Sequence, residues 1–142
     1  MLLEGKNVLL TGAARGIGAA TLAALAADGA NVWALARTQT EAFEARCAAL
    51  AAAHGVWVKP LYADLTDEAA VTAAVKAAMA DKLPLDILVN DAGVMGPDKM
   101  FQLTPVAEMR ALFETNLFGT LYLTQLATRW MARKRQGAMV NI

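Results

Sequence analysis

The chain has 142 residues, enough for one domain, and its 13 basic and 13 acidic side chains give a formal net charge of zero. This balance argues against nucleic acid or an anionic membrane surface as a partner, and no apolar run reaches the roughly 18 residues of a membrane span. The single cysteine excludes an internal disulfide, and the start of the chain leaves no room for a signal peptide, so we expect a cytoplasmic protein.

The first predicted strand covers residues 7–11, and a glycine-rich turn leads from it into a helix predicted over 16–27. Residues 11–18 read T-G-A-A-R-G-I-G. Glycines allow the backbone to turn sharply and to approach a ligand closely, while the unpaired N–H groups at a helix start attract anions. The turn therefore predicts a site for the diphosphate of a dinucleotide. A tight connection that binds nothing is the alternative for the glycines alone.

Strands and helices alternate along the rest of the chain. Strands are predicted at residues 31–36, 56–63, 86–90 and 138–142, and helices at about 38–53, 66–81 and 105–136. This alternation predicts a doubly wound, Rossmann-like α/β fold, in which a parallel sheet is covered by helices on both faces. Ligands of such sheets bind beyond the carboxyl ends of the strands, where the glycine-rich turn also lies.

Local signals mark several helix ends. Thr38 and Glu41 have the spacing of a capping box, and we expect Thr66 to cap the third helix. The fourth helix is expected to run to Gln136 and to end at Gly137. Cys47 lies in an alanine-rich helix and is expected to be a small core residue.

The chain stops inside the apolar strand predicted at residues 138–142. A finished domain rarely leaves a half-made strand at the edge of its sheet, because the unpaired backbone groups invite aggregation. We therefore expect residues 1–142 to form a single dinucleotide-binding domain that is incomplete at its C-terminus.

Four motifs in this order resemble those of the short-chain dehydrogenase/reductase family, and the resemblance extends over essentially the whole chain. Residues 11–18 match its TGxxxGIG pattern, 63–67 (A-D-L-T-D) match the segment after the third strand, and 90–93 (N-D-A-G) resemble its NNAG motif. Asn116, within the segment E-T-N-L-F-G, matches the asparagine of the family's catalytic tetrad. Residues 137–142 resemble the start of the strand that leads to the family's catalytic serine.

The resemblance implies hydride transfer between a nicotinamide cofactor and a small carbonyl or alcohol substrate. Asn116 would hold a water molecule in the proton path, and Asp64 would contact the adenine ring. The catalytic serine and the Tyr-x-x-x-Lys pair of the family would lie beyond Ile142, so the chain alone is expected to be inactive. The residues expected to bind the cofactor are Thr11, Gly12, Ala14, Arg15, Gly16, Ile17, Gly18, Arg37, Thr38, Asp64, Leu65, Asn90, Ala92 and Gly93.

One motif departs from the family pattern at Asp91, which stands where a second asparagine is usual. That motif mainly stabilises the central sheet and lines the cofactor site in the family. We expect the replacement to have a small effect.

The end of the second strand predicts which nicotinamide binds. An acidic residue there would bond the ribose 2′-hydroxyl of NAD, but Ala36 holds this position and Arg37 follows it. Arg15 lies in the turn beside the same ribose, and guanidinium groups make paired, charge-assisted bonds to phosphate. Thr38 could add a hydroxyl. We therefore expect NADP(H) to be preferred over NAD(H), the alternative being that both arginines are solvated surface charges.

Two other function classes fit the same residues: a cofactor-binding sensor or inactive family member without chemistry, and a structural subunit with a vestigial turn. A Tyr-x-x-x-Lys pair in the following sequence would favour the enzyme. No Cys/His cluster suggests a metal, and His54 and the basic residues 129–135 fit helix ends, where cations complement the dipole. Leucines on the fourth helix are compatible with a homo-oligomer contact in the full-length protein, but a core would use the same residues: Leu112, Leu117, Leu121 and Leu123.

Overall fold

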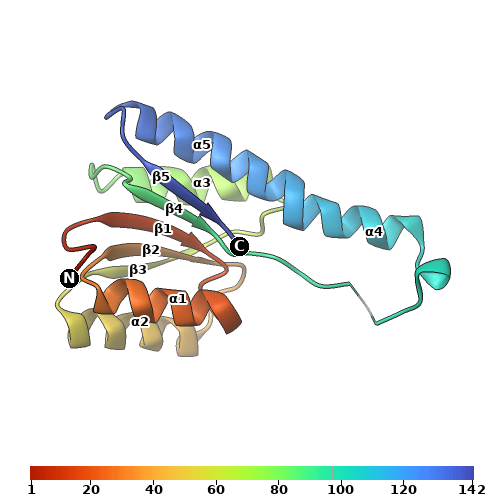
Figure 1. Ribbon diagram of the computed structural model, residues 1–142, viewed down its shortest axis with the longest axis horizontal. Helices are drawn as coiled ribbons and strands as arrows, with labels where there is room; N and C mark the ends of the chain where they lie inside the picture. Colours follow the sequence, from red (N-terminus) through yellow and green to blue (C-terminus); the bar gives the residue numbers. More distant parts are fainter. Residues whose placement is uncertain (97) are drawn as a thin grey trace.

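The computed structural model of the chain describes residues 1–96 and 98–142, which form a layered α/β sandwich (Figure 1). The strands are β1 (Asn7–Thr11), β2 (Asn31–Ala36), β3 (Val58–Tyr62), β4 (Ile87–Asn90) and β5 (Ala138–Asn141). The helices are α1 (Gly16–Ala27), α2 (Glu41–His54), α3 (Glu68–Met79), α4 (Val106–Phe113) and α5 (Thr120–Ala132). A short 3-10 helix, η1 (Phe101–Leu103), precedes α4, and a π-helical segment, η2 (Glu114–Gly119), joins α4 to α5.

The sheet is parallel, with strand order β3-β2-β1-β4-β5. Helices α1 and α2 cover one face, and α3 and α5 cover the other (Figure 1). The predicted doubly wound fold is thus confirmed. Winding reverses between β1 and β4, where Val8 pairs with Ile87. The loops that leave these two strands therefore border the crevice where ligands of such sheets bind.

The apolar run in strand β1 is continuous because both faces of this strand are buried. Val8 and Leu10 pack toward α1 and α2, whereas Leu9 packs toward α3 and α5. Successive side chains of a strand alternate between faces, so a two-sided core requires an apolar residue at every position. On the α2 side Cys47 is 1% exposed, and burial raises the pKa of its thiol to about 11. The expectation of a core cysteine is confirmed.

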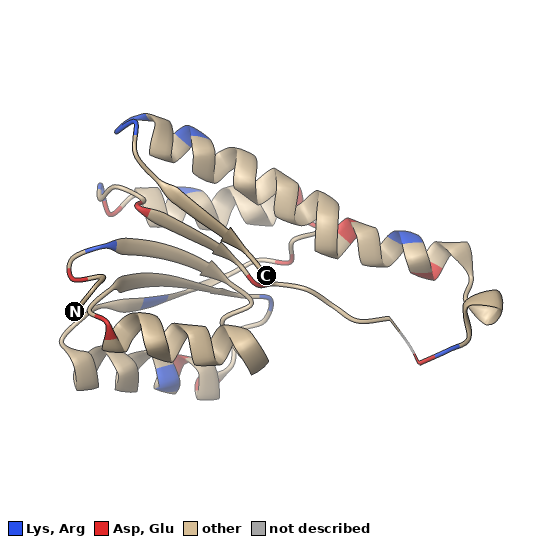
Figure 2. Cartoon of the chain, in the orientation of Figure 1, with Lys and Arg blue, Asp and Glu red and all other residues tan. Residues whose placement is uncertain are grey.

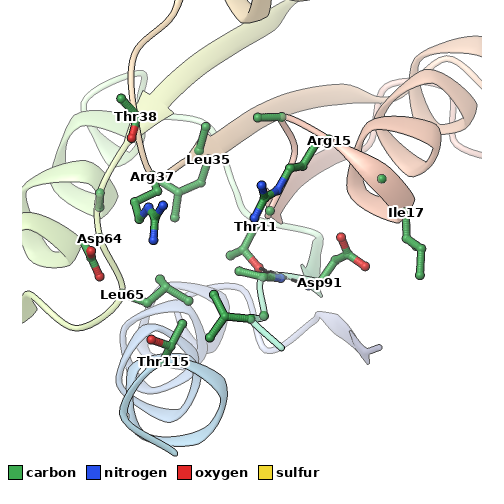
Figure 3. A pocket seen from close by; sticks show the side chains of 18 of the residues that line it. Thr11, Arg15, Ile17, Leu35, Arg37, Thr38, Asp64, Leu65, Asp91 and Thr115 are labelled. Atoms are coloured by element: carbon green, nitrogen blue, oxygen red, sulfur yellow. Dashed lines mark hydrogen bonds between the residues drawn. The ribbon is translucent and has the colours of Figure 1, made fainter. Parts of the chain in front are cut away.

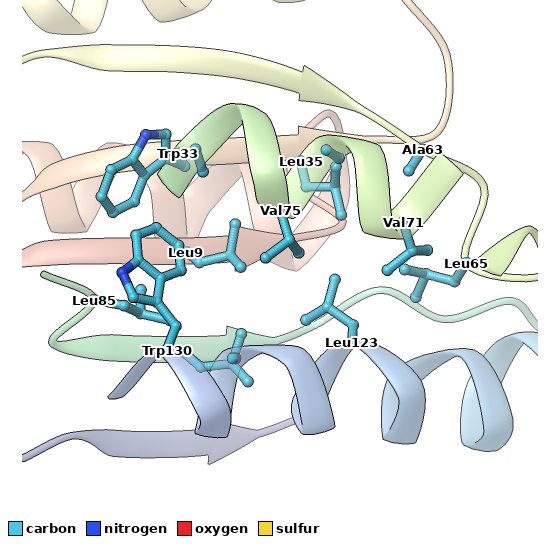
Figure 4. Packing of buried hydrophobic residues seen from close by; sticks show 14 of the residues in the cluster. Leu9, Trp33, Leu35, Ala63, Leu65, Val71, Val75, Leu85, Leu123 and Trp130 are labelled. Atoms are coloured by element: carbon cyan, nitrogen blue, oxygen red, sulfur yellow. The ribbon is translucent and has the colours of Figure 1, made fainter. Parts of the chain in front are cut away.

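Three tryptophans pack together on the other face. The ring centroid of Trp33 lies 4.8 Å from that of Trp57 and 5.0 Å from that of Trp130, and Figure 4 shows Trp33 and Trp130 in this core. The Trp33 indole N–H donates to Asp81 Oδ2 at 2.9 Å, and Lys59 Nζ donates to Asp81 Oδ1 at 2.6 Å. These two bonds lower the pKa of Asp81, the lysine having the larger effect.

Because the folded-state pKa of Asp81 is lowered, its contribution to stability is present above the ordinary pKa and is lost as pH falls through the folded value. Asp81→Asn keeps an acceptor for the indole but removes the charge, so we expect a loss of about 1 kcal/mol at neutral pH. Urea unfolding at about pH 7 and about pH 3 should show this loss shrinking in acid. Asp98→Asn, at an exposed carboxylate, is the control. A loss that is independent of pH would contradict the prediction.

Two predicted helix caps are wrong by one or two residues. Thr40, not Thr38, caps α2, because its hydroxyl accepts from the Phe43 N–H at 3.2 Å. Asp67, not Thr66, caps α3 by accepting from the Ala70 N–H at 3.0 Å. A cap must stand immediately before the first helical residue, and both helices begin slightly later than predicted.

The predicted helix over residues 105–136 is continuous in Figure 1 but not uniform. The π-helical segment η2 interrupts it, and α5 ends at Ala132 rather than Gln136. After the helix, the residue with a left-handed backbone is Arg135, whose φ is +53°, and not Gly137. Gly119 is buried in η2, where an added Cβ would overlap the Leu65 carbonyl oxygen. Glycine is therefore needed because the helix passes close to the loop after β3.

Among the described residues, no helix combines the length and hydrophobicity needed to cross a membrane.

Candidate functional site

A cavity of about 640 Å³ opens at the carboxyl end of the sheet (Figure 3). Its size is within the range of small-molecule and cofactor sites. The loops after β1, β2, β3 and β4 contribute to it, as the strand order requires. The predicted binding residues that line it are Thr11, Gly12, Ala14, Arg15, Gly16, Ile17, Arg37, Thr38, Asp64, Leu65, Ala92 and Gly93.

The glycine-rich turn is folded tightly against the loop after β4. Gly12 has a φ of +69°, and an added Cβ would lie 2.9 Å from the Ala92 backbone N. At Gly18 an added Cβ would overlap the Gly12 carbonyl oxygen. The buried Thr11 hydroxyl fixes the same junction by accepting from the N–H groups of Asp91 and Ala92, at 3.1 and 3.0 Å. The turn thus brings bare backbone to the edge of the cavity.

Helix α1 begins at this edge without a side-chain cap. Arg15 is its N-cap in extended conformation and makes no capping bond, and the first turn contains no acidic residue. Ile17, in that first turn, is 63% exposed and lines the cavity. The unpaired N–H groups and the positive end of the helix dipole favour an anion at this corner.

Two arginines flank the cavity. Arg15 comes from the turn and Arg37 from the end of β2, and Figure 3 shows both guanidinium groups in the same opening. Ala36, at the position where an acidic residue would bond a ribose hydroxyl, is buried and also lines the cavity. The arrangement can bind a phosphate ester with paired bonds.

Asp64 provides a carboxylate on the β3 side of the cavity. Its Oδ1 accepts from the backbone N–H of Thr66 at 2.9 Å and from the Thr66 hydroxyl at 2.7 Å. These bonds lower the pKa of Asp64, the backbone bond most, and the charge of Arg37 lowers it further. Asp64 is therefore an oriented, ionised acceptor near Arg37.

Three predicted residues do not line the cavity. Gly18 lies beneath the turn. Asn90 is buried, and its Nδ2 donates to Thr124 Oγ1 at 3.0 Å and to Asn141 Oδ1 at 2.9 Å, which ties β4 to α5 and β5. Asn116 lies in η2 and exchanges two 2.8 Å bonds with the backbone N–H and carbonyl of Val94. Asn116 therefore holds the loop after β4 against the long helix.

Sequence reasoning missed other residues at the site. Arg46, from the middle of α2, donates from Nη1 to the Ala14 carbonyl oxygen at 2.6 Å and so braces the turn. No motif includes Arg46, since the contact spans 32 residues. The remaining lining residues lie within or beside recognised motifs or strand ends, although they were not among the residues expected to bind the cofactor: Leu35, Ala36, Thr40, Ala63, Asp91, Val94, Met95 and Thr115. Across residues 1–96 and 98–142, no group of three or more metal-binding side chains is arranged to hold an ion.

Known proteins resemble this chain in sequence and in fold. A model of the short chain dehydrogenase family matches residues 6–142. The 3-oxoacyl-(acyl-carrier-protein) reductase of Escherichia coli (strain K12) is 34% identical over 142 residues, which is 100% of this chain and 56% of the relative.

Solved structures of known proteins have the same fold as this chain. L-sorbose reductase from Gluconobacter frateurii, complexed with NADPH and L-sorbose, has a TM-score of 0.89 at 26% identity over 99% of this chain and 53% of that one. NAD+-bound xylitol dehydrogenase has a TM-score of 0.92 at 30% identity over 99% of this chain and 54% of that one. The chain spans about half the length of the curated relatives it matches.

Proposed function

Because this chain belongs to the short-chain dehydrogenase/reductase family, we propose that its protein is an NADP(H)-dependent oxidoreductase that transfers hydride between the nicotinamide and a small carbonyl or alcohol substrate. The cavity carries the proposal: it combines a helix N-terminus that receives no capping bond from Arg15, a glycine-rich turn in which Gly12 and Gly18 have no room for a Cβ, and two arginines at one opening. These features fit a diphosphate and a third phosphate ester.

The residues of this chain would bind and orient the cofactor. The backbone around Gly12, Gly16 and Ile17 would hold the diphosphate, and Arg15 and Arg37 would hold the 2′-phosphate. Asp64 would accept from the adenine amino group. When bound, NADP(H) supplies the hydride chemistry. In this proposal Asn116 belongs to the catalytic site. Its side-chain amide holds the loop after β4 in place through its two hydrogen bonds with the backbone of Val94.

The choice of NADP(H) rests on charge. One solved relative was obtained with NADPH and another with NAD+, so the fold is compatible with either nicotinamide. The absence of a carboxylate at Ala36 and the presence of Arg37 support NADP(H). A non-catalytic NADP-binding sensor would use the same cavity.

Reduction of a carbonyl panel by NADPH, measured with the full-length protein, separates the enzyme from the sensor. NADPH oxidation that requires the carbonyl supports the enzyme. Tight NADPH binding without turnover on any carbonyl or alcohol would support the sensor instead.

We propose that the protein is cytoplasmic. We also propose that its partner is a small molecule and neither nucleic acid nor a membrane.

We further propose a homo-oligomer in which the long helix makes the contact. Of the leucines predicted for this role, Leu123 is fully buried in the core, whereas Leu117 and Leu121 are 41% and 50% exposed. Phe113 and Phe118 nearby are also exposed. Leu121→Glu is expected to shift the full-length protein toward monomer in sedimentation velocity. A wild-type protein that sediments as a monomer would contradict this proposal.

A further inference from the structure

The carboxylate of Asp91 lies at the start of α1, on the wall of the cavity. Its Oδ2 is 2.6 Å from where a Cβ on Gly18 would be, and the Gly18 backbone N–H lowers the pKa of this carboxyl. Figure 3 shows Asp91 between Thr11 and Ile17, on the side where the helix begins. A negative side chain therefore already occupies part of the helix end that favours anions.

This position is unfavourable for the carboxylate despite the nearby Gly18 N–H. Burial raises the pKa of Asp91, and the Gly18 N–H offsets this only in part. The charge is thus incompletely compensated, and a second anion brought to the same helix end would be repelled at short range.

We propose that Asp91 is an affinity-determining residue that weakens binding of the dinucleotide's diphosphate by placing a negative charge at the α1 N-terminus. The proposal rests on the proposed function, since it concerns the same cavity. It also replaces the expectation of a small effect at this position. The charge and the contact with Gly18 make separate contributions: the contact joins the loop after β4 to α1, while the charge opposes the phosphates.

Asp91→Asn separates these contributions, because the amide has nearly the size of the carboxylate and keeps an oxygen beside Gly18 while the charge is gone. In the full-length protein, calorimetric titration with NADPH should give about tenfold tighter binding for this variant than for the wild type. Adenosine, which carries no phosphate, should bind both equally. Asp28→Asn is the matched control, since it removes the same charge from the other end of α1 and should leave both affinities unchanged.

Unchanged NADPH affinity in Asp91→Asn, beside a wild type that binds NADPH, would overturn this inference and leave the proposed function intact. Equal strengthening of adenosine binding would also overturn it, since charge would not be the cause. Failure of every variant to bind any nicotinamide dinucleotide would overturn the proposed function itself. Asp91→Ser gives the same comparison if the asparagine variant does not fold, with tighter NADPH binding expected.

Discussion

Gly18→Ala is expected to weaken dinucleotide binding severely and to destabilise the fold by about 3 kcal/mol. The added Cβ would overlap the carbonyl oxygen of Gly12 and lie 2.6 Å from Asp91 Oδ2. The Asp91 side chain can turn away, but the carbonyl group of Gly12 belongs to the backbone of the turn and cannot. The turn must therefore move, and with it the N–H groups that would hold the diphosphate. Binding of NADPH should fall by about 100-fold or more.

Gly5→Ala is the matched control for this prediction. Gly5 has a φ of +71° with open space around its added Cβ, and it lies before β1, away from the cavity. The same substitution there should cost about 1 kcal/mol of backbone strain and leave NADPH affinity unchanged. Thermal unfolding and fluorescence titration of both variants of the full-length protein provide the comparison. Native NADPH affinity in Gly18→Ala would show that the turn does not hold the diphosphate.

Arg37→Ala is expected to weaken NADPH binding by about 10- to 100-fold while changing NADH binding little. Hydrogen bonds to a charged group contribute about 1.5–3 kcal/mol, and only NADPH offers the 2′-phosphate that Arg37 would contact. Ala36 offers NADH no compensating acceptor. Titration with both nucleotides gives the ratio of affinities directly. The wild type should prefer NADPH, and the variant should lose most of this preference.

Arg133→Ala is the control for Arg37→Ala, because it removes the same charge at the far end of α5. Basic side chains gather there, outside the cavity (Figure 2). Salt should weaken NADPH binding to the wild type more than NADH binding, since the extra interaction is ionic. Tighter binding of NADH than of NADPH to the wild type would refute the proposed preference. So would an Arg37→Ala variant whose ratio of affinities is unchanged.

Periodicity and glycine spacing in the sequence were sufficient for the fold and for most of the cavity. The apolar run Val8–Leu10 predicted a strand buried on both faces, since no polar residue interrupts it. The turn over residues 11–18 predicted a phosphate corner, because closely spaced glycines permit the positive φ that Gly12 and Gly16 adopt. Both patterns can be recognised within a few consecutive residues, and both strand and turn are present where they were predicted.

Contacts between distant segments had no local signal. Arg46 reaches Ala14 across 32 residues, and Asn116 bonds Val94 across 22. The helix caps were misplaced because several polar residues precede each helix, and only the packed helix decides which one faces its first N–H groups.

Asp91 illustrates the division between sequence and tertiary structure. The sequence by itself determined that a carboxylate follows β4 and that a glycine-rich turn follows β1. Only the pairing of β1 with β4 decided that the carboxylate meets the N-terminus of α1, because parallel strands bring their carboxyl ends to the same edge of the sheet. The strength of the resulting repulsion depends on distance and burial, which are properties of the folded chain.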